Sequence, residues 1–327
     1  MPEPGWWVLA CIALVPFLIA VWDEKPKSAL LYGILTGFVY NTIIIWWITI
    51  FGYLPWILLV LYQSLFFGVF AVIANLFRPQ KAGLLLIIAL PSAWVIMQWV
   101  RTLGTYAFPW GSFAHTQIPN FGLIQIASIT GFYGIDFILF LFNTMFALFL
   151  ICSKYSRLSL SVIIAIIILN VSLTVYFHFS ENKIDNAYNI AKVAMIQRSE
   201  ETGITATRHE VMNASEVYGK LTIEAGKLNP DFIVWPETAL PVAITPTGWG
   251  ALISSLAKFT NSHLIAGVIE PYQANYDYNY NSAFVYNNNG DMIGKYRKVK
   301  LVPFGEFVPP DRRASSVKVE ILLAPLR

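Results

Sequence analysis

The first 180 residues form a series of long apolar stretches, whereas the remaining residues mix short apolar runs with polar segments. An α-helix needs about 20 apolar residues to span a bilayer. Several stretches of the first part are close to that length or longer. We therefore predict a transmembrane domain over residues 1–180 with about six helices, which in chain order are Trp6–Trp22, Ala29–Ile50, Leu54–Phe77, Leu84–Val100, Leu123–Ile151 and Leu158–Phe179.

In the second part, residues 181–327, the apolar runs are short and polar segments separate them, as in a water-facing domain. Its Asn287–Gly290 segment, N-N-N-G between two apolar runs, is a strong hairpin turn sequence. Strands that alternate with helices and end in a hairpin indicate a layered α/β domain. The predicted elements are a buried strand at Lys192–Ile196, a helix at Arg208–Leu228, a strand at Phe232–Trp235, a helix at Trp249–Phe259, a strand at Leu264–Ile269, and a hairpin of Ala283–Tyr286 with Met292–Tyr296.

Composition supports this division. The 327 residues are 56% hydrophobic and only 13% charged, whereas soluble domains average about 25% charged residues. The net charge of +3 is small and dispersed, so we expect no nucleic-acid partner.

Basic residues in the short loops predict the orientation. They concentrate in the first, third and fifth loops, and only Arg101 lies in an even-numbered loop. We therefore expect the odd loops to face the cytoplasm, and the amino terminus and the domain after Phe179 to be extracytoplasmic. The residues of the odd loops are Lys25, Lys27, Arg78, Lys81, Lys154 and Arg157.

The fourth loop, Thr105–Asn120, is too polar to span a membrane and unusually aromatic. It is typical of an aromatic belt at the membrane interface. A re-entrant segment that lines a lipid entry fits the same residues, and the sequence leaves both interpretations open. We expect Asp136, just beyond it, to be a helix-start or interface residue rather than a catalyst.

Cysteine and histidine usage restricts the chemistry. The two cysteines, Cys11 and Cys152, lie in apolar surroundings, which excludes a disulfide framework. The four histidines show no ligand spacing, so we expect no metal and no cofactor.

Two motifs carry the candidate chemistry. The segment W-P-E at 235–237 places Glu237 at the carboxyl end of a predicted buried strand, which is a frequent location of functional sites. The segment Gly294–Pro309, G-K-Y-R-K-V-K-L-V-P-F-G-E-F-V-P, clusters cations ahead of Glu306. Taken alone, the second segment also fits a solvated basic hairpin edge. Its cations are Lys295, Arg297, Lys298 and Lys300.

Together the two motifs resemble the nitrilase, or carbon-nitrogen hydrolase, superfamily. The L-V-P-F-G-E-F-V-P form, with F-P-W-G at Phe108–Gly111 and G-F-Y-G-I-D-F at Gly131–Phe137, resembles its membrane branch, the apolipoprotein N-acyltransferases. The resemblance covers nearly all of the chain and implies an α-β-β-α sandwich for the second domain. Gln98 stands where that family's P-x-x-W-x-x-x-E-W-x-R pattern has a glutamate.

The resemblance implies a catalytic set of Glu237 as general base, Lys298 as the lysine, and Glu306 as a second glutamate that holds it. In the family these residues serve a cysteine nucleophile. A thiol with a pKa of about 8.5 is mostly protonated at neutral pH, so a carboxylate takes its proton and a fixed ammonium stabilises the oxyanion. We expect Glu237 and Lys298 to form a buried pair, whose loss in Glu237→Gln costs on the order of 3–5 kcal/mol.

No cysteine lies between Ser153 and Arg327. In the family, the nucleophilic cysteine and a final spanning helix follow the L-V-P-F-G-E motif, and a further helix precedes the first one of this chain. We therefore expect this chain to be incomplete at both ends and inactive alone.

Three functions stay open at this point. The resemblance implies acyl transfer from a membrane phospholipid to the N-terminal amino group of the lipid-modified cysteine of an apolipoprotein. It also implies a monomer of the bacterial inner membrane with a periplasmic second domain. The alternatives are a membrane-tethered amidase and a non-catalytic membrane protein that binds lipid or lipoprotein. A cysteine and one more span encoded downstream of codon 327 would favour an enzyme.

Overall fold

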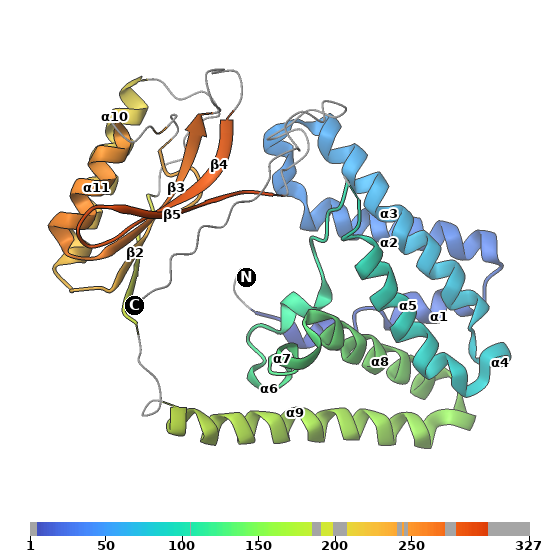
Figure 1. The fold of residues 1–327 in the computed structure, drawn as a ribbon. Helices are drawn as coiled ribbons and strands as arrows, with labels where there is room; N and C mark the ends of the chain where they lie inside the picture. Colours follow the sequence, from blue (N-terminus) through green and yellow to red (C-terminus); the bar gives the residue numbers. More distant parts are fainter. Residues whose placement is uncertain are drawn as a thin grey trace. The chain divides into compact units, whose positions relative to one another are not determined.

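The computed structural model describes residues 5–104, 106–184, 191–198, 208–240, 244, 248–271 and 279–299. It divides the chain into two compact units, Met1–Ala187 and Tyr188–Arg327 (Figure 1). The described residues of the first unit form only helices, and those of the second form a sheet with helices. The predicted combination of an apolar helical region with an α/β domain is confirmed.

The helical unit joins long α-helices through short 3₁₀ helices, labelled η. Its elements are η1 (Trp7–Cys11), α1 (Val15–Trp22), α2 (Pro26–Ile44), η2 (Trp46–Phe51), α3 (Tyr53–Leu76), α4 (Pro79–Ala82), η3 (Gly83–Leu85), α5 (Leu86–Val100), η4 (Phe113–Gln117), α6 (Phe121–Ile124), α7 (Ala127–Thr130), α8 (Phe132–Ile151), η5 (Ser153–Tyr155) and α9 (Ser156–Ile184).

Four helices among the described residues are long and apolar enough to cross a membrane: Tyr53–Leu76, Pro79–Val100, Phe132–Ile151 and Ser153–Ser180. The first expected span is a shorter apolar helix, Trp7–Trp22. The second is α2, which ends at Ile44 and continues as the 3₁₀ helix η2 rather than as one helix to Ile50. The count of six spans therefore stays a prediction.

The expected span Leu123–Ile151 is wrong in its first third. Two single-turn helices, α6 and α7, precede the break, and the long helix α8 begins only at Phe132. Gly131 adopts a φ of +63°, where a helix cannot continue and where glycine is the favoured residue. The break leaves Phe121–Thr130 outside the long helix.

Helices α2 and α3 run side by side because glycines remove the side chains between them (Figure 1). A Cβ on Gly33 would lie 2.5 Å from the carbonyl oxygen of Phe67 and 2.7 Å from the Cα of Gly68. A Cβ on Gly37 would lie 2.8 Å from the Cβ of Phe67. Small residues four apart allow this backbone approach in membranes, where apolar burial against lipid gives little driving force.

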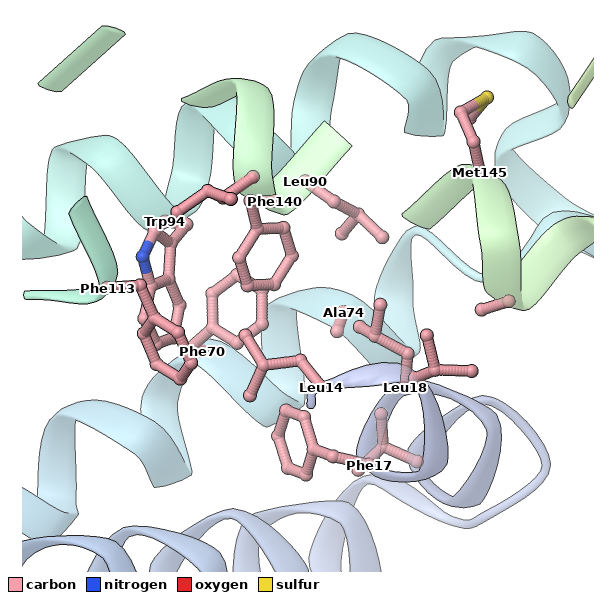
Figure 2. Close-up of a cluster of buried hydrophobic side chains, with 14 of the residues drawn as sticks. Leu14, Phe17, Leu18, Phe70, Ala74, Leu90, Trp94, Phe113, Phe140 and Met145 are labelled. Atoms are coloured by element: carbon pink, nitrogen blue, oxygen red, sulfur yellow. The ribbon is translucent and has the colours of Figure 1, made fainter. Parts of the chain in front are cut away.

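An aromatic cluster forms the core of the helical unit (Figure 2). The ring of Trp94 in α5 stacks on Phe140 of α8, with centroids 4.8 Å apart. The ring of Phe70 from α3 meets both edge-on, at 5.2 Å and 4.9 Å. These contacts join α3, α5 and α8. By contrast, only 11% of the most apolar stretch of α9 is buried.

The second unit contains a five-stranded sheet in the order β1-β2-β3-β4-β5. The first three strands pair in parallel and the last three in antiparallel fashion. The hairpin between β4 and β5 is confirmed, since the turn at Asn287–Gly290 has Gly290 at a φ of +86°. The strands are β1 (Val193–Met195), β2 (Phe232–Val234), β3 (His263–Pro271), β4 (Asn279–Tyr286) and β5 (Met292–Arg297).

Two helices, α10 (Arg208–Gly226) and α11 (Trp249–Thr260), pack on one face of the sheet. Their buried side chains meet alternate residues of β3 and β4, which all point to this face. The strand residues in this core are Leu264, Ala266, Val268, Phe284 and Tyr286.

The strand expected at Lys192–Ile196 is confirmed as β1, but the expectation that it is buried is wrong for the described part of the chain. The side chains of Val193 and Met195 in β1 are 52% and 85% exposed. Strand β1 is the last strand at its end of the sheet, and the described helices cover only one of its faces. Ala194, between the two, packs against the helix-covered core.

Candidate active site

Glu237 follows β2, and the residues before it fix where β2 ends. The indole N–H of Trp235 donates to the Thr222 hydroxyl on α10 over 2.9 Å. The same ring stacks on Tyr218, with centroids 4.9 Å apart. The backbone N–H of Trp235 also donates to the Ile265 carbonyl of β3 over 2.8 Å. Trp235 thereby anchors the strand end from which Glu237 projects.

Gly267 in β3 lets the Glu237 backbone lie directly on the sheet. A Cβ at this position would lie 2.2 Å from the Pro236 carbonyl oxygen and 2.7 Å from the Glu237 Cα, distances that no side chain tolerates. The Ala239 N–H then donates to the Gly267 carbonyl over 3.0 Å. This close approach brings Glu237 to the sheet face opposite to α10 and α11.

Lys298 reaches the same place from β5. Its backbone N–H donates to the Asn281 carbonyl of β4 over 2.8 Å, which extends the ladder one residue beyond Arg297. Its Nζ lies 2.9 Å from Glu237 Oε1. The structure therefore brings together the base and the lysine that the two motifs predict.

Asn281 completes the described site. Its side-chain amide also donates to Glu237 Oε1, so Oε2 has no hydrogen bond to any residue in the described ranges. The hydrogen bond from Lys298 lowers the pKa of the Glu237 carboxyl; partial burial opposes this and the Asn281 amide adds to it. Glu237 is thus held as a carboxylate with one oxygen open to a proton donor.

The expectation that this pair is buried is wrong. The side chain of Glu237 is 61% exposed and that of Lys298 is 28% exposed. Water screens such a pair, so the cost of breaking it falls toward that of a surface ion pair, below about 1 kcal/mol. Glu306 and Lys300 lie outside the described residues.

The basic cluster of the motif does not act as one group. Lys298 points to Glu237, whereas Lys295 and Arg297 both bind Glu270 of β3. Alternation along a strand explains the division, since residues 295 and 297 share one face and residue 298 points to the other. A solvated hairpin edge does not describe these three cations, because each has a carboxylate partner.

Sequence reasoning missed Asn281 and Glu270. Asn281 follows a tyrosine-rich stretch of the sequence and lies in β4, which begins at Asn279. The ring of Tyr280 lies 3.9 Å from the Arg297 guanidinium carbon. Tyr272, Tyr276 and Tyr278 lie outside the described residues. The β3–β4 register, which the sequence does not display, is what places Asn281 and Glu270 at facing strand ends.

The helical unit holds a second polar group of residues, around the fourth loop. The Arg101 guanidinium is buried and donates to the side-chain oxygens of Gln63 and Gln98 and to the Trp110 carbonyl. Asp136, fully buried in α8, accepts from the Ser112 hydroxyl and the Ala114 N–H, both over 2.8 Å.

These contacts hold the loop at both ends of the Trp110–Ala114 segment. Gln98 thus serves as an acceptor for Arg101. Within the described part of the chain, the Asp136 carboxylate is used to anchor the loop. Both interpretations of the loop, belt or lipid entry, stay open.

Comparison with known proteins assigns both units. A family described as "Apolipoprotein N-acyltransferase N-terminal domain" matches residues 1–145, and one described as "Carbon-nitrogen hydrolase" matches residues 189–320. A relative from Geobacter metallireducens named apolipoprotein N-acyltransferase is 32% identical, over 94% of this chain and 62% of its own. One of the same name from Chlorobaculum tepidum is 24% identical, over 92% and 60%.

A solved structure of a carbon-nitrogen hydrolase from Helicobacter pylori G27 aligns with 36% of this chain and 42% of its own, at 21% identity and a TM-score of 0.28. The family match over residues 189–320 indicates that the second unit is of the carbon-nitrogen hydrolase class. Over 94% of its length the chain is similar to a protein named apolipoprotein N-acyltransferase, and four helices among its described residues are long and apolar enough to cross a membrane. It spans 62% and 60% of the length of the two relatives.

Proposed function

We propose that this protein transfers a fatty acyl chain from a membrane phospholipid to the N-terminal amino group of the lipid-modified cysteine of an apolipoprotein. The observation that carries the proposal is the Glu237–Lys298 pair at the end of β2, in a chain that joins a carbon-nitrogen hydrolase unit to apolar helices. The matches of residues 1–145 and 189–320 to these two families support it.

The reaction runs in two balanced steps. A thiol attacks the ester carbonyl of the phospholipid, which forms a thioester and releases a lysophospholipid. The amine of the apolipoprotein then attacks the thioester, which forms an amide and frees the thiol. Glu237 takes the thiol proton on Oε2 and returns a proton to the leaving alkoxide.

Lys298 and Asn281 orient the Glu237 carboxylate through Oε1, and the Lys298 ammonium lies where it can stabilise an oxyanion. By its place in the motif, we assign Glu306 the role of holding Lys298 and the intermediate. Residues 153–327 contain no cysteine, so the nucleophilic thiol has no candidate there.

The helical unit explains why the acceptor is an amine and the donor a lipid, where a carbon-nitrogen hydrolase core alone uses water. The loop charges support a location of the second unit outside the cytoplasm, which in a bacterium with two membranes is the periplasmic side of the inner membrane. The partners are then the phospholipid, the diacylglyceryl-modified apolipoprotein and the membrane itself, with the protein acting as a monomer.

The test uses the gene in its own reading frame, with any codons that adjoin these 327, in bacteria depleted of their own apolipoprotein N-acyltransferase. Mass spectrometry of a lipoprotein's N-terminal peptide measures the amide-linked acyl chain. We expect the chain to appear, to be lost in Glu237→Gln and Lys298→Arg, and to persist in Glu216→Gln, which changes an exposed ion pair on α10.

Two results would favour the other functions. Hydrolysis of short-chain amides without lipoprotein acylation indicates a membrane-tethered amidase. Bound phospholipid without either reaction indicates a lipid-binding protein.

A further inference from the structure

Glu270, the penultimate residue of β3, is the most heavily hydrogen-bonded carboxylate in the described part of the second unit. It is 8% exposed. Arg297 grips it with two donors, Nε to Oε2 at 2.8 Å and Nη2 to Oε1 at 2.6 Å. Lys295 Nζ donates to Oε1 over 3.0 Å, and the Ser282 hydroxyl donates to Oε2 over 2.9 Å. One side chain thus joins β3, β4 and β5.

These contacts keep Glu270 ionised. Burial raises the pKa of its carboxyl, but the hydrogen bonds from Arg297, Lys295 and Ser282 outweigh burial and hold the pKa at about 2. A carboxylate with so low a pKa is a poor proton acceptor. Glu270 also points to the helix-covered face of the sheet, away from Glu237, so it is not suited to act as a catalytic base.

The position of this cluster in the sequence links it to the site. Among the described residues, Asn281 and Lys298 are the two that bind Glu237 Oε1. Lys298 directly follows Arg297, and Asn281 directly precedes Ser282. Each partner of Glu237 is therefore the immediate chain neighbour of a residue that binds Glu270.

Because side chains alternate along a strand, fixing a residue on one face of the sheet also fixes the direction of its neighbour on the other face. Arg297 and Ser282 are paired in the β4–β5 register and point to the helix-covered face, so their neighbours Lys298 and Asn281 point to the other face. A two-donor arginine grip fixes direction as well as distance. Fixing Arg297 fixes the peptide from which the Lys298 side chain departs.

We propose that Glu270 is a positioning residue for the candidate active site: by holding Arg297 and Ser282 on one face of the sheet, it sets Lys298 and Asn281 against Glu237 on the other. Its importance for catalysis rests on the proposed function, whereas its effect on Lys298 does not.

The test reads the Lys298 amine directly in the full chain in detergent. An amine-specific acylating reagent is applied for short times, and peptide mass spectrometry gives the labelling rate of Lys298 relative to the exposed Lys258 of α11. Glu237→Gln removes the ion pair and sets the upper limit. The expected rise is roughly two- to fivefold, the range for losing a partly exposed pair.

Glu270→Gln keeps the shape of the side chain but removes the charge and the two-donor grip. We expect Lys298 labelling to rise to most of the Glu237→Gln value, with circular dichroism of the folded protein unchanged. The matched control Glu216→Gln, which also breaks a glutamate–lysine pair, should leave it unchanged. A role in stability alone would lower the melting temperature without changing Lys298 labelling in the folded state.

Milder variants keep the test decisive if Glu270→Gln unfolds. Arg297→Lys retains the charge but loses the two-donor geometry, and Ser282→Ala removes one hydrogen bond; both should raise Lys298 labelling, the first more than the second. Lys295→Gln removes a donor to Glu270 on an exposed side chain and leaves Arg297 in place, so it should change little.

Two results overturn the proposal: Lys298 labelling that stays at the parent rate in the folded variants, or labelling that does not respond to Glu237→Gln. Neither measurement requires acyl transfer. If Lys298 responds to Glu270→Gln while Lys298→Arg leaves lipoprotein acylation intact, the positioning stands and the proposed function fails.

Discussion

The Nζ of Lys298 lies 2.9 Å from Oε1 of Glu237, although 61 residues separate the two in the sequence. One belongs to the end of a parallel strand and the other to the end of an antiparallel hairpin. The pair forms where the parallel and antiparallel parts of the sheet meet at β3. The anchoring of Trp235, the close approach at Gly267 and the β4–β5 ladder bring the two side chains together.

Loss of the pair should cost little stability. In Glu237→Gln the Lys298 ammonium loses its carboxylate, but both side chains are partly in water. We expect the free energy of unfolding of the full chain in detergent to fall by less than about 1 kcal/mol. Thermal unfolding followed by circular dichroism measures this, and a loss of about 3 kcal/mol or more, the range for a broken buried pair, would mean that the pair is buried after all.

Acid should weaken the second unit through Glu270. The pKa of this carboxyl is about 2 in the folded protein, below its ordinary value of 4.5. A depressed pKa contributes stability that is complete above pH 4.5 and is lost as the pH falls through about 2. The contribution at neutral pH is up to roughly 3 kcal/mol.

Unfolding free energies of the parent and of Glu270→Gln, measured from about pH 7 to about pH 2, check this. The difference between them should be largest at neutral pH and should shrink toward the acid end. A difference that does not depend on pH would show that the substitution acts through packing rather than through charge.

Gly267→Ala should move Glu237. The added methyl group would meet the backbone of Pro236 and Glu237 at distances that force a shift, at a cost of about 1–3 kcal/mol or more. We expect lower thermal stability together with faster acylation of Lys298, because its partner moves away. Gly219→Ala is the control: in the middle of α10, no described atom beyond the adjoining helix backbone lies within 4 Å of the added group, and the change should stabilise the helix by about 0.5–1 kcal/mol.

The orientation derived from the loop charges is open to a fusion test. A reporter that is active only outside the cytoplasm should work when fused after Ser180 and should fail when fused between Lys25 and Lys27. The reverse pattern would place the second unit in the cytoplasm and would remove the periplasmic assignment.

The helices, the hairpin and the strand end that carries Glu237 were predictable because each has a signal within a short stretch of sequence. Apolar length gives the spanning helices, the N-N-N-G turn gives the β4–β5 hairpin, and the position of Glu237 after a strand places a carboxylate at a strand end. The break at Gly131 was missed because the flanking residues are as apolar as the helix itself. Only the backbone conformation of the glycine distinguishes them.

The partners of the site residues depend on register, which the sequence does not display. Whether Arg297 or Lys298 faces Glu237 changes with a shift of one residue, and the β4–β5 ladder contains an irregularity at Val285/Tyr286. Asn281 and Glu270 could therefore be assigned only from the folded sheet. In the same way, Arg101 finds Gln63 at 38 residues' separation, through the packing of α3 and α5.

A polypeptide of these 327 residues should form no acyl-enzyme thioester. Its cysteines, Cys11 and Cys152, belong to the helical unit, and the described hydroxyl beside the lysine motif, Ser282, is 3% exposed. Ser282 donates to Glu270 on the face opposite to Glu237, and a carboxylate with a pKa of about 2 cannot activate it. Lys298 donates to Glu237, and this pairing favours its ammonium form over the free amine that an attack needs. Purified protein incubated with an acyl-labelled phospholipid should therefore retain no label that survives denaturation and is released by hydroxylamine, although labelled lipid bound without a covalent bond is compatible with the helical unit.

The control is Glu216→Gln, which should behave as the parent. A hydroxylamine-sensitive label that disappears in Glu237→Ala would show that a nucleophile of this polypeptide completes the site after all.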